Sequence, residues 1–375
     1  MWSYNNPVRI LFGNEGFASI APLIGGRPYA LVTYPDTPFQ VLTEHLTKEA
    51  GQPLIVVNDI APNPNFKLLS EQSARFASLR VGPEVIVALG GGSVIDSAKV
   101  FAAAGGDFNR VQRHLEAGCG EPTLATIPVI AVPTTAGTGS EVTSFATVWD
   151  EERGRKFSLA HKSLYPEVAV VDPKLMLGKP YGLTLATGLD ALSHSVESIW
   201  NINANPVSAR HAVAAAKAIL ANLANLLGDL SNLELRNRIA EASLDAGLAF
   251  SNTKTAIAHN LSYPITLGWG VQHGIACSFT LPTILRSVAG VGGFRETALK
   301  QVFGEDLGRG ADDLTKFLKS LGVGHRFADH GVPDDACTKI IDEAFAGERG
   351  KNFIGSKARF LKAANQSGVL TPSLA

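Results

Sequence analysis

The sequence predicts an α/β domain over residues 1–180 and an all-helical domain over residues 181–375. Three observations lead to this prediction. The first half alternates short apolar β-branched runs with helical stretches, which is typical of a parallel sheet buried on both faces. After Pro173 the strand signals fade, and helical spacing of Ala and Leu takes over from about Thr184. The length of 375 residues exceeds one ordinary core, so two domains are expected.

The expected strands are continuous apolar runs bounded by Gly, Pro or Asn. They are Tyr29–Tyr34, Leu54–Asn58, Val85–Leu89, Ile127–Val132 and Val168–Val171. Helical patterns lie between strands, for example over Pro38–Glu49 and Phe66–Ser78. This alternation predicts a doubly wound, Rossmann-like sheet.

The second half is expected to contain long amphipathic helices. Their ranges are Ala209–Leu227, Leu233–Phe250 and Asp312–Leu321. The segment Asp172–Leu183 is rich in Pro, Gly and Lys and is the expected junction between the domains.

The bulk composition indicates a soluble globular protein. Hydrophobic residues make up 45%, and the net charge of −1 offers no field for nucleic acid or an anionic membrane. Cys119, Cys277 and Cys337 form no CxxC motif, and their odd number argues against a disulfide framework. The N-terminal stretch has Arg9 within its apolar run, which is unlike a signal peptide or a membrane anchor. We therefore expect a cytoplasmic protein.

A glycine-rich turn follows the third expected strand, in ALGGGSVIDSAKV. Gly91 and Gly92 allow backbone N–H groups to approach a phosphate, and Ser93 adds a hydroxyl. Val94–Ala104 would be the helix whose N-terminus faces that anion. The alternative is an ordinary tight turn between a strand and a helix, since this is not a GxGxxG sequence.

A second loop, in AVPTTAGTGSEVTS, follows the fourth expected strand. Thr134, Thr135, Thr138 and Ser140 place hydroxyls around two glycines. Both loops would lie at the carboxyl ends of parallel strands, where open α/β sheets bind ligands. Together they favour a dinucleotide-binding domain, although a hydroxyl-rich turn is the alternative for this loop alone.

Four residues suit a divalent metal. Asp190 and His194 are one helical turn apart in TGLDALSHSVES, so they share a helix face. His259 and His273 are separated by Pro264 and two glycines, which excludes one continuous helix. One carboxylate and three imidazoles fit Fe²⁺ or Zn²⁺. Taken singly, each is more often a surface or hydrogen-bonded core residue.

The sequence resembles the iron-containing (group III) alcohol dehydrogenase family from about Asn6 to beyond Pro282. The motifs that carry the resemblance are GGGSVIDSAK, PTTAGTGSEVT, VVDPKL, TGLDALSHSVE and the two histidine segments. The resemblance implies a dehydroquinate synthase-like fold, with a dinucleotide-binding domain followed by a helical metal-binding domain. It places metal ligands, which are catalytic through the metal, at Asp190, His194, His259 and His273. It places cofactor-binding positions at Gly91, Gly92, Ser93, Asp96, Thr134, Thr135, Thr138 and Ser140, with Lys162 near the cofactor. It also implies a homodimer.

Two positions depart from the family pattern. Tyr263 stands where relatives commonly carry a second histidine linked to proton relay. A tyrosine with its ordinary pKa near 10 is a poor shuttle at neutral pH, so Tyr263 is a relay candidate only if that pKa is shifted. Tyr34 stands where NAD-preferring relatives often place an acid, with Asp36 two places on. The choice between NAD and NADP therefore stays open.

The stretch HNLSYPIT is similar to the family branch associated with phosphonate metabolism, which implies phosphonoacetaldehyde and 2-hydroxyethylphosphonate as the substrate pair. Such a dianion needs cationic partners near the metal. The candidates are Lys162, Arg210, Arg349 and Lys351, and exposed surface charge is the alternative for each.

The resulting hypothesis is hydride transfer between a nicotinamide and the carbonyl carbon of a small aldehyde, with the metal polarising the carbonyl. One alternative is another enzyme of the superfamily, such as a glycerol-type dehydrogenase or a dehydroquinate synthase-like cyclase. Another is a non-catalytic sensor that binds NAD and metal. A soluble α/β protein with coincidental motifs is the least specific interpretation.

Overall fold

The computed structural model describes residues 1–116, 124–150 and 155–370, and its chain divides into two compact units. The α/β unit comprises Asn6–Thr135 and Gly139–Leu177. The helical unit comprises Met1–Asn5, Ala136–Thr138 and Gly178–Ala375. The domain boundary between residues 180 and 181 stays a prediction, and the last passage of the chain from the α/β unit to the helical unit lies close to it, between Leu177 and Gly178.

The α/β unit is built on a parallel sheet, as the sequence predicted. Within the described ranges, six parallel strands pair in the order β1-β8-β5-β4-β2-β3. Their bounds are β1 (Arg9–Phe12), β2 (Tyr29–Val32), β3 (Ile55–Val57), β4 (Val85–Gly90), β5 (Val129–Pro133) and β8 (Val168–Val171). Strand β1 was not predicted, nor was the antiparallel pair β6 (Phe145–Asp150) and β7 (Arg155–Ala160).

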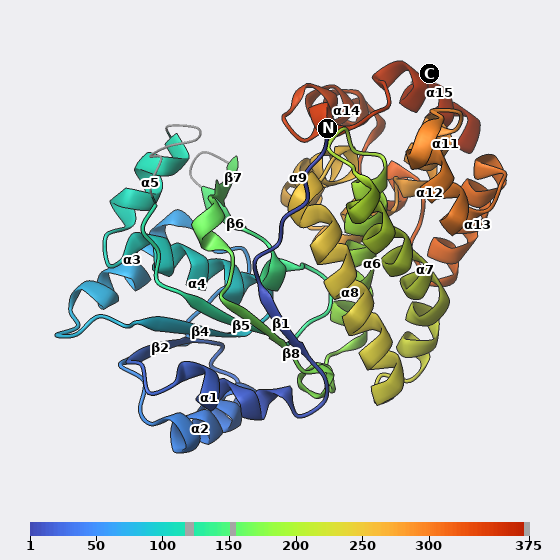
Figure 1. Cartoon of the computed structure of the whole chain (residues 1–375). Coiled ribbons are helices and arrows are strands. Elements are labelled where there is room, and N and C mark those ends of the chain that lie inside the picture. The colour runs from blue at the N-terminus through green and yellow to red at the C-terminus, as the bar shows by residue number, and fades with distance from the viewer. Residues whose placement is uncertain (117–123, 151–154, 371–375) are drawn as a thin grey trace. The chain divides into compact units, whose positions relative to one another are not determined.

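Helices cover both faces of this sheet (Figure 1). Side chains of β4 alternate between the faces: Ile86 joins the core under α3, α4 and α5, whereas Val87 joins the core with α1 and α2. The helices are α1 (Ile20–Ile24), α2 (Thr37–Ala50), α3 (Phe66–Ala77), α4 (Gly92–Ala104) and α5 (Phe108–Glu116). Burial on both faces explains why the central strands are continuously apolar.

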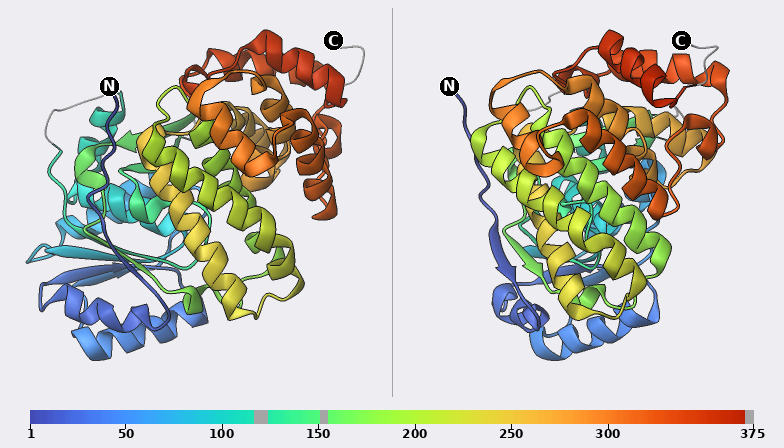
Figure 2. Two further views of the ribbon diagram at one scale, coloured as in Figure 1. Left: turned by 45° about the vertical axis from the view of Figure 1, so that its right-hand side comes forward. Right: turned by 90° about the vertical axis from the view of Figure 1, so that its right-hand side faces the viewer.

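The helical unit packs around three long helices, α6, α7 and α8. Figure 2 shows α7 and α8, coloured green to yellow, running alongside each other. The bounds are α6 (Tyr181–Ile199), α7 (Pro206–Gly228), α8 (Leu233–Thr253), α9 (Ile257–Trp269), α10 (His273–Ser278), α11 (Leu281–Val288), α12 (Gly293–Phe303), α13 (Leu307–Ser320), α14 (Asp334–Ala346) and α15 (Lys357–Ser367). The prediction of an all-helical second half is confirmed.

Helix α7 is long and apolar enough to cross a membrane by length and composition alone. Its apolar residues Ala212, Ala216, Ile219 and Leu223 are fully buried against α6 and α8, as in the core helix of a globular unit. The prediction of a protein that does not bind membranes rests on composition and stays a prediction.

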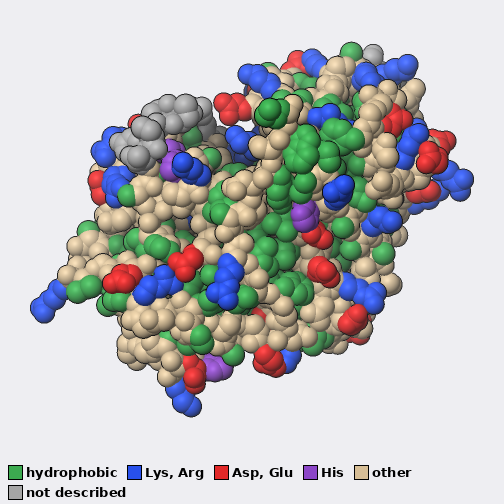
Figure 3. All heavy atoms as spheres, viewed as in Figure 1, with side chains coloured by type: hydrophobic (Ala, Val, Ile, Leu, Met, Phe, Trp, Pro, Cys, Tyr) green, Lys and Arg blue, Asp and Glu red, His purple; other side chains and the backbone are tan. Residues whose placement is uncertain are grey.

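Charged side chains of both signs are interspersed on the face that Figure 3 draws. This mixture agrees with the net charge of −1. Of the three cysteines, Cys277 and Cys337 are buried free thiols, whereas Cys119 lies outside the described residues.

Candidate metal and cofactor sites

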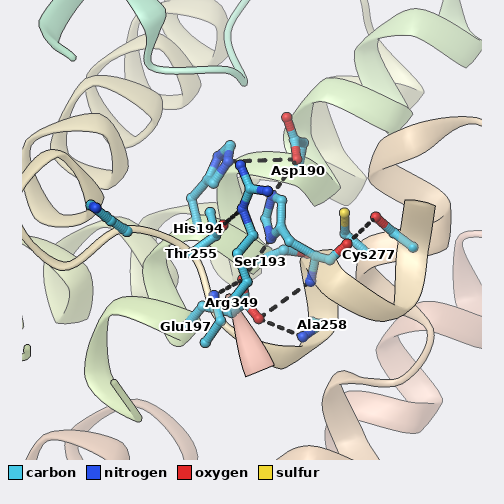
Figure 4. Close-up of polar contacts among 12 residues, drawn as sticks. Asp190, Ser193, His194, Glu197, Thr255, Ala258, Cys277 and Arg349 are labelled. Atoms are coloured by element: carbon cyan, nitrogen blue, oxygen red, sulfur yellow. Dashed lines mark hydrogen bonds and ion pairs between the residues drawn. The ribbon is translucent and has the colours of Figure 1, made fainter. Parts of the chain in front are cut away.

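Three helices of the helical unit bring the four predicted metal ligands together. Asp190 and His194 lie one turn apart on α6, His259 lies in the first turn of α9, and His273 begins α10. From Asp190 Oδ1 the distance is 3.4 Å to His259 Nε2 and 3.9 Å to Nε2 of both His194 and His273. Figure 4 shows the Asp190 carboxylate directed toward the imidazoles.

This geometry fits a divalent ion. Metal bonds to nitrogen and oxygen are about 2.0–2.2 Å long, so ligand atoms around one ion lie roughly 3–4 Å apart. Asp190 Oδ1 and His259 Nε2 are buried, and neither has a hydrogen-bond partner among the described residues. Because buried polar atoms are costly without a partner, this arrangement has a place for a cation.

The electrostatics favour the ligating protonation state for Asp190 and His194 but, without a cation beside it, not for His259. Burial acts to raise the pKa of Asp190, but the adjacent histidines hold it below its ordinary value, so the carboxylate is ionised. Burial lowers the pKa of His194 to about 4, which keeps this imidazole neutral. Burial also acts to lower the pKa of His259, but negative charge beside it, including Glu197, raises it.

Backbone and carboxylate acceptors orient two of the imidazoles. His194 Nδ1 donates to the carbonyl oxygen of Gly137 at 3.2 Å, and His259 Nδ1 donates to Glu197 Oε2 at 2.5 Å. Each bond uses Nδ1 and directs Nε2 toward Asp190. Residue 137 must be a glycine for this approach, because a Cβ on Gly137 would lie only 2.6 Å from Cβ of Thr187.

Glu197 is a site residue that the sequence reasoning missed. It lies on α6, is fully buried, and accepts backbone N–H groups of Ala256 at 3.0 Å and Ala258 at 2.5 Å at the start of α9. One carboxylate therefore fixes both the N-terminus of α9 and the ring of His259. Its position one turn beyond His194 was the available signal, since i, i+3 and i+4 residues share a helix face.

Helix α10 approaches α6 unusually closely. A Cβ on Gly274 would overlap the carbonyl oxygen of Ala186 and would come within 3.1 Å of Asp190 Cβ. The glycine lets α10 reach α6, which places the adjacent His273 beside Asp190.

Cys277 adds a soft donor to the cluster. Its Sγ lies 3.6 Å from His273 Nε2. Among the described residues, one donor atom each of Asp190, His259, His273 and Cys277 lie within 4.8 Å of one another, and this group includes Cys277 in place of His194. Burial raises the pKa of the Cys277 thiol, so it is protonated at neutral pH. Sequence reasoning missed it, although it follows His273 by four residues on α10, the same spacing as Asp190 and His194.

The cluster is open to solvent on the side of His273. The side chain of His273 is 34% exposed, whereas those of Asp190, His194 and His259 are 8%, 7% and 3% exposed. The ring of Tyr263 stacks on His273 at 5.8 Å, with the planes 6° apart. A substrate would therefore meet the metal ligands beside Tyr263.

The α/β unit contains the glycine-rich turn at the end of β4. Gly91 caps the N-terminus of α4, which begins at Gly92 and Ser93. A Cβ on Gly91 would lie 3.2 Å from Thr135 Oγ1, so the first loop touches the second. N–H groups at a helix N-terminus, with hydroxyls beside them, are groups that commonly bind phosphate in proteins.

A buried lysine ties part of the second loop to α4. Lys99 Nζ donates to the carbonyl oxygens of Ser140, Thr143 and Phe145 at 2.6, 2.8 and 2.9 Å. Ser140 Oγ donates to Asp96 Oδ1 at 2.5 Å. The predicted cofactor residues Asp96 and Ser140 are thus bonded to each other, and burial lowers the pKa of Lys99 to about 8.

The remaining predicted cofactor residues are spread over both units. Thr134 donates its N–H to Gly90 and has a buried hydroxyl without a partner in the described part of the chain. Lys162 is exposed, and Thr138 belongs to the helical unit. Burial raises the pKa of Tyr34, and a hydrogen bond with Ser93 partly offsets this. Tyr34 therefore lies beside the glycine-rich turn.

Sequence comparison assigns both halves of this architecture. The model described as "Iron-containing alcohol dehydrogenase" matches residues 7–173, and that described as "Fe-containing alcohol dehydrogenase family, C-terminal" matches residues 184–357. The chain belongs to the iron-containing alcohol dehydrogenase family. As an iron-type alcohol dehydrogenase it is an oxidoreductase, which confirms the resemblance seen in the motifs.

Proteins that are similar to this alcohol dehydrogenase are named for several different activities. It is 31% identical to a NAD-dependent methanol dehydrogenase of Bacillus methanolicus, over 86% of this chain and 87% of that protein. It is 36% identical to a phosphonoacetaldehyde reductase of Streptomyces viridochromogenes, over 71% of this chain and 65% of that protein. The crystal structure of sulfoacetaldehyde reductase from Bifidobacterium kashiwanohense, in complex with NAD⁺, superposes with a TM-score of 0.89 at 26% identity and covers 99% of both chains.

Proposed function

We propose that this enzyme reduces a small aldehyde carrying a tetrahedral oxyanion, with phosphonoacetaldehyde and 2-hydroxyethylphosphonate as the first pair to test. The redox chemistry rests on one observation. A buried oxygen of the Asp190 carboxylate lies beside three imidazoles and has no hydrogen-bond partner among the described residues. The substrate class is supported by the relatives that are named phosphonoacetaldehyde reductase and sulfoacetaldehyde reductase.

In this proposal Asp190, His194, His259 and His273 hold a divalent metal, Fe²⁺ or Zn²⁺. When bound, the metal acts as a Lewis acid on the aldehyde carbonyl and the reduced nicotinamide supplies the hydride. Glu197 and the Gly137 carbonyl keep two imidazoles oriented. The solvent-exposed side of His273 leaves room for the substrate.

The residues of the α/β unit bind the cofactor. Backbone N–H groups at Gly92 and Ser93 and the Thr135 hydroxyl hold phosphate oxygens, and the buried Thr134 hydroxyl is free to donate to the same ligand. We propose NAD as the first cofactor, because two of the similar proteins are named with it. Asp96, Thr138, Ser140 and Lys162 stay as proposed cofactor positions.

We propose that the Tyr263 hydroxyl supplies the proton that converts the reduced carbonyl oxygen into the product alcohol. Its ring stacks on the proposed ligand His273, which is the most exposed of the four. If Tyr263→Phe turns over normally, water supplies that proton instead.

The decisive assay follows oxidation of NADH and NADPH by metal-loaded enzyme. Phosphonoacetaldehyde is compared with sulfoacetaldehyde, propanal and lactaldehyde. We expect high kcat/KM for an anionic aldehyde and slow turnover of propanal. No turnover of any aldehyde, with metal and cofactor bound, would favour a sensor or a cyclase of the same superfamily.

The ligand assignment has its own test. We expect Asp190→Ala and His259→Ala to lose the metal and most turnover, whereas His45→Ala, an exposed histidine on α2, keeps both. Full activity with metal retained in either ligand variant would refute the assignment. Sedimentation equilibrium tests the homodimer that the family implies.

A further inference from the structure

We infer that Arg349 binds the oxyanion of the substrate and so selects anionic aldehydes over neutral ones. The shared chemistry is a phosphonate or sulfonate group, and the inference rests on the proposed function. Four cationic side chains are candidates by sequence, and the structure separates them. Lys162, Arg210 and Lys351 are exposed, whereas Arg349 is half-buried.

Arg349 is linked to the metal cluster through one aromatic ring. The guanidinium carbon lies 5.0 Å from the ring centre of Tyr263. The same ring stacks on the metal-ligand candidate His273. Figure 4 shows the Arg349 side chain extending along Thr255 toward the cluster. A substrate whose carbonyl meets the open side of His273 would therefore have its tail within reach of this guanidinium.

The guanidinium has donors left for an anion. An arginine side chain carries five N–H donors in a planar fork. Arg349 Nε donates to Thr255 Oγ1 at 2.9 Å, and no carboxylate of the described residues pairs with Arg349. A fork with unused donors matches two oxygens of a phosphonate or sulfonate.

The side chain is held in place before any ligand binds. Thr255 is buried, and its carbonyl oxygen accepts a hydrogen bond from Asn352 Nδ2 at 2.9 Å. The backbone after Arg349 packs tightly on α14, since a Cβ on Gly350 would overlap the carbonyl oxygen of Ala344. Such preorganisation lowers the entropic cost of binding and makes selection by charge effective.

The test compares Arg349→Gln and Arg349→Lys with the exposed controls Arg210→Gln and Lys351→Gln. Each metal-loaded enzyme is assayed with phosphonoacetaldehyde, sulfoacetaldehyde and propanal at saturating NADH, and with ethylphosphonate as a non-reacting competitor. Metal content, KM for NADH and thermal unfolding are measured in parallel. These readouts show whether a variant has lost its fold, its metal or its cofactor site.

We expect Arg349→Gln to lose about 10- to 100-fold in kcat/KM for the anionic aldehydes, as removal of a hydrogen-bonded charge does, with propanal little changed. Arg349→Lys should recover part of this loss, and the controls should match wild type. A larger loss for phosphonoacetaldehyde than for sulfoacetaldehyde would identify the phosphonate dianion as the preferred tail.

Three results separate this inference from the proposed function. Equal losses with propanal, or a raised KM for NADH alone, would overturn the role of Arg349 and leave the proposed substrate intact. Inhibition of wild type but not of Arg349→Gln by ethylphosphonate, without turnover of anionic aldehydes, would support Arg349 and overturn the substrate. Neither inhibition nor preference in wild type would overturn both.

Discussion

At the residue scale, the orientation of the proposed metal ligands depends on two groups that are not themselves proposed ligands. The Gly137 carbonyl accepts a hydrogen bond from Nδ1 of His194, and the Glu197 carboxylate accepts one from Nδ1 of His259. These acceptors come from distant parts of the sequence, because Glu197 and its α9 partners are 59–62 residues apart. The proximity of the four side chains could be predicted, since Asp190 and His194 share a helix face and belong to recognisable motifs, whereas their role as metal ligands stays a prediction. Glu197 could not be singled out, because only the fold shows that its carboxylate is buried against His259.

Removing the charge of Glu197 should weaken metal binding. Glu197→Gln keeps the shape but replaces a charged acceptor beside His259 with an amide. We expect the metal Kd to rise about 10- to 100-fold, as for other outer-shell partners of metal-bound histidines. Competition with a chromophoric chelator measures this Kd, with the exposed Glu234→Gln on α8 as the matched control. An unchanged Kd would show that α9 alone positions His259.

Cys277 should prove dispensable for holding the metal. Its buried thiol has a raised pKa, whereas the proposed ligands Asp190, His194, His259 and His273 would together supply four donors. We therefore expect Cys277→Ala to keep full metal content. Cobalt-substituted enzyme provides the measurement, because a thiolate ligand would add a sulfur-to-metal charge-transfer band that the alanine variant lacks. Observation of that band in wild type would place Cys277 in the ligand set.

Glu141 should make the stability of the α/β unit depend on pH. Burial raises the pKa of Glu141 from 4.5 to about 7 in the folded protein. The folded state therefore holds the Glu141 proton more tightly than the unfolded state does. Proton binding stabilises the fold at low pH, and this contribution to the free energy of unfolding is lost as pH rises from about 4.5 through 7. The shift corresponds to about 3 kcal/mol. Urea unfolding gives the difference in unfolding free energy between Glu141→Gln and wild type. We expect this difference to favour the variant more at pH 7.5 than at pH 5. An equal difference at both pH values would contradict this prediction.

At the element scale, the close approach of α10 to α6 places the proposed ligand His273 beside Asp190. Gly274 permits a contact that no side chain would allow, and His273 precedes it directly. The sequence predicted the strands that are buried on both faces, such as β4, because their apolar runs are continuous. It missed β1, a strand of four residues at the edge of the sheet that begins at the exposed Arg9 and pairs with β8.

Adding one methyl group at this contact should displace α10. We expect Gly274→Ala to weaken metal binding by a factor of about ten or more, since the new Cβ overlaps the carbonyl oxygen of Ala186 and α10 must move away from Asp190. Metal content after dialysis and thermal unfolding are the measurements. Gly268→Ala, where the added Cβ would meet open space, is the control. If Gly274→Ala keeps its metal, the helices adjust without moving His273.

At the scale of the whole molecule, the metal should contribute to the stability of the helical unit. It would join α6, α9 and α10 and give partners to the buried Asp190 Oδ1 and His259 Nε2. Removal with a chelator should lower the unfolding temperature, and the shift should grow with free metal concentration on reloading. Calorimetry of metal-free and reloaded protein tests this. No change in Asp190→Ala would confirm that the effect comes from this cluster.

The interleaving of the two units has a consequence for how the polypeptide is made. The chain passes between the units at residues 5/6, 135/136, 138/139 and 177/178, so the helical unit is not one uninterrupted stretch. Tyr4 near the beginning donates to the carbonyl oxygen of Leu248, and Gly137 binds His194. On the ribosome, the first five residues must wait until α8 has emerged before they find their contacts. A gene fragment encoding only residues 178–375 would likewise lack the Gly137 carbonyl, leaving His194 without its orienting acceptor.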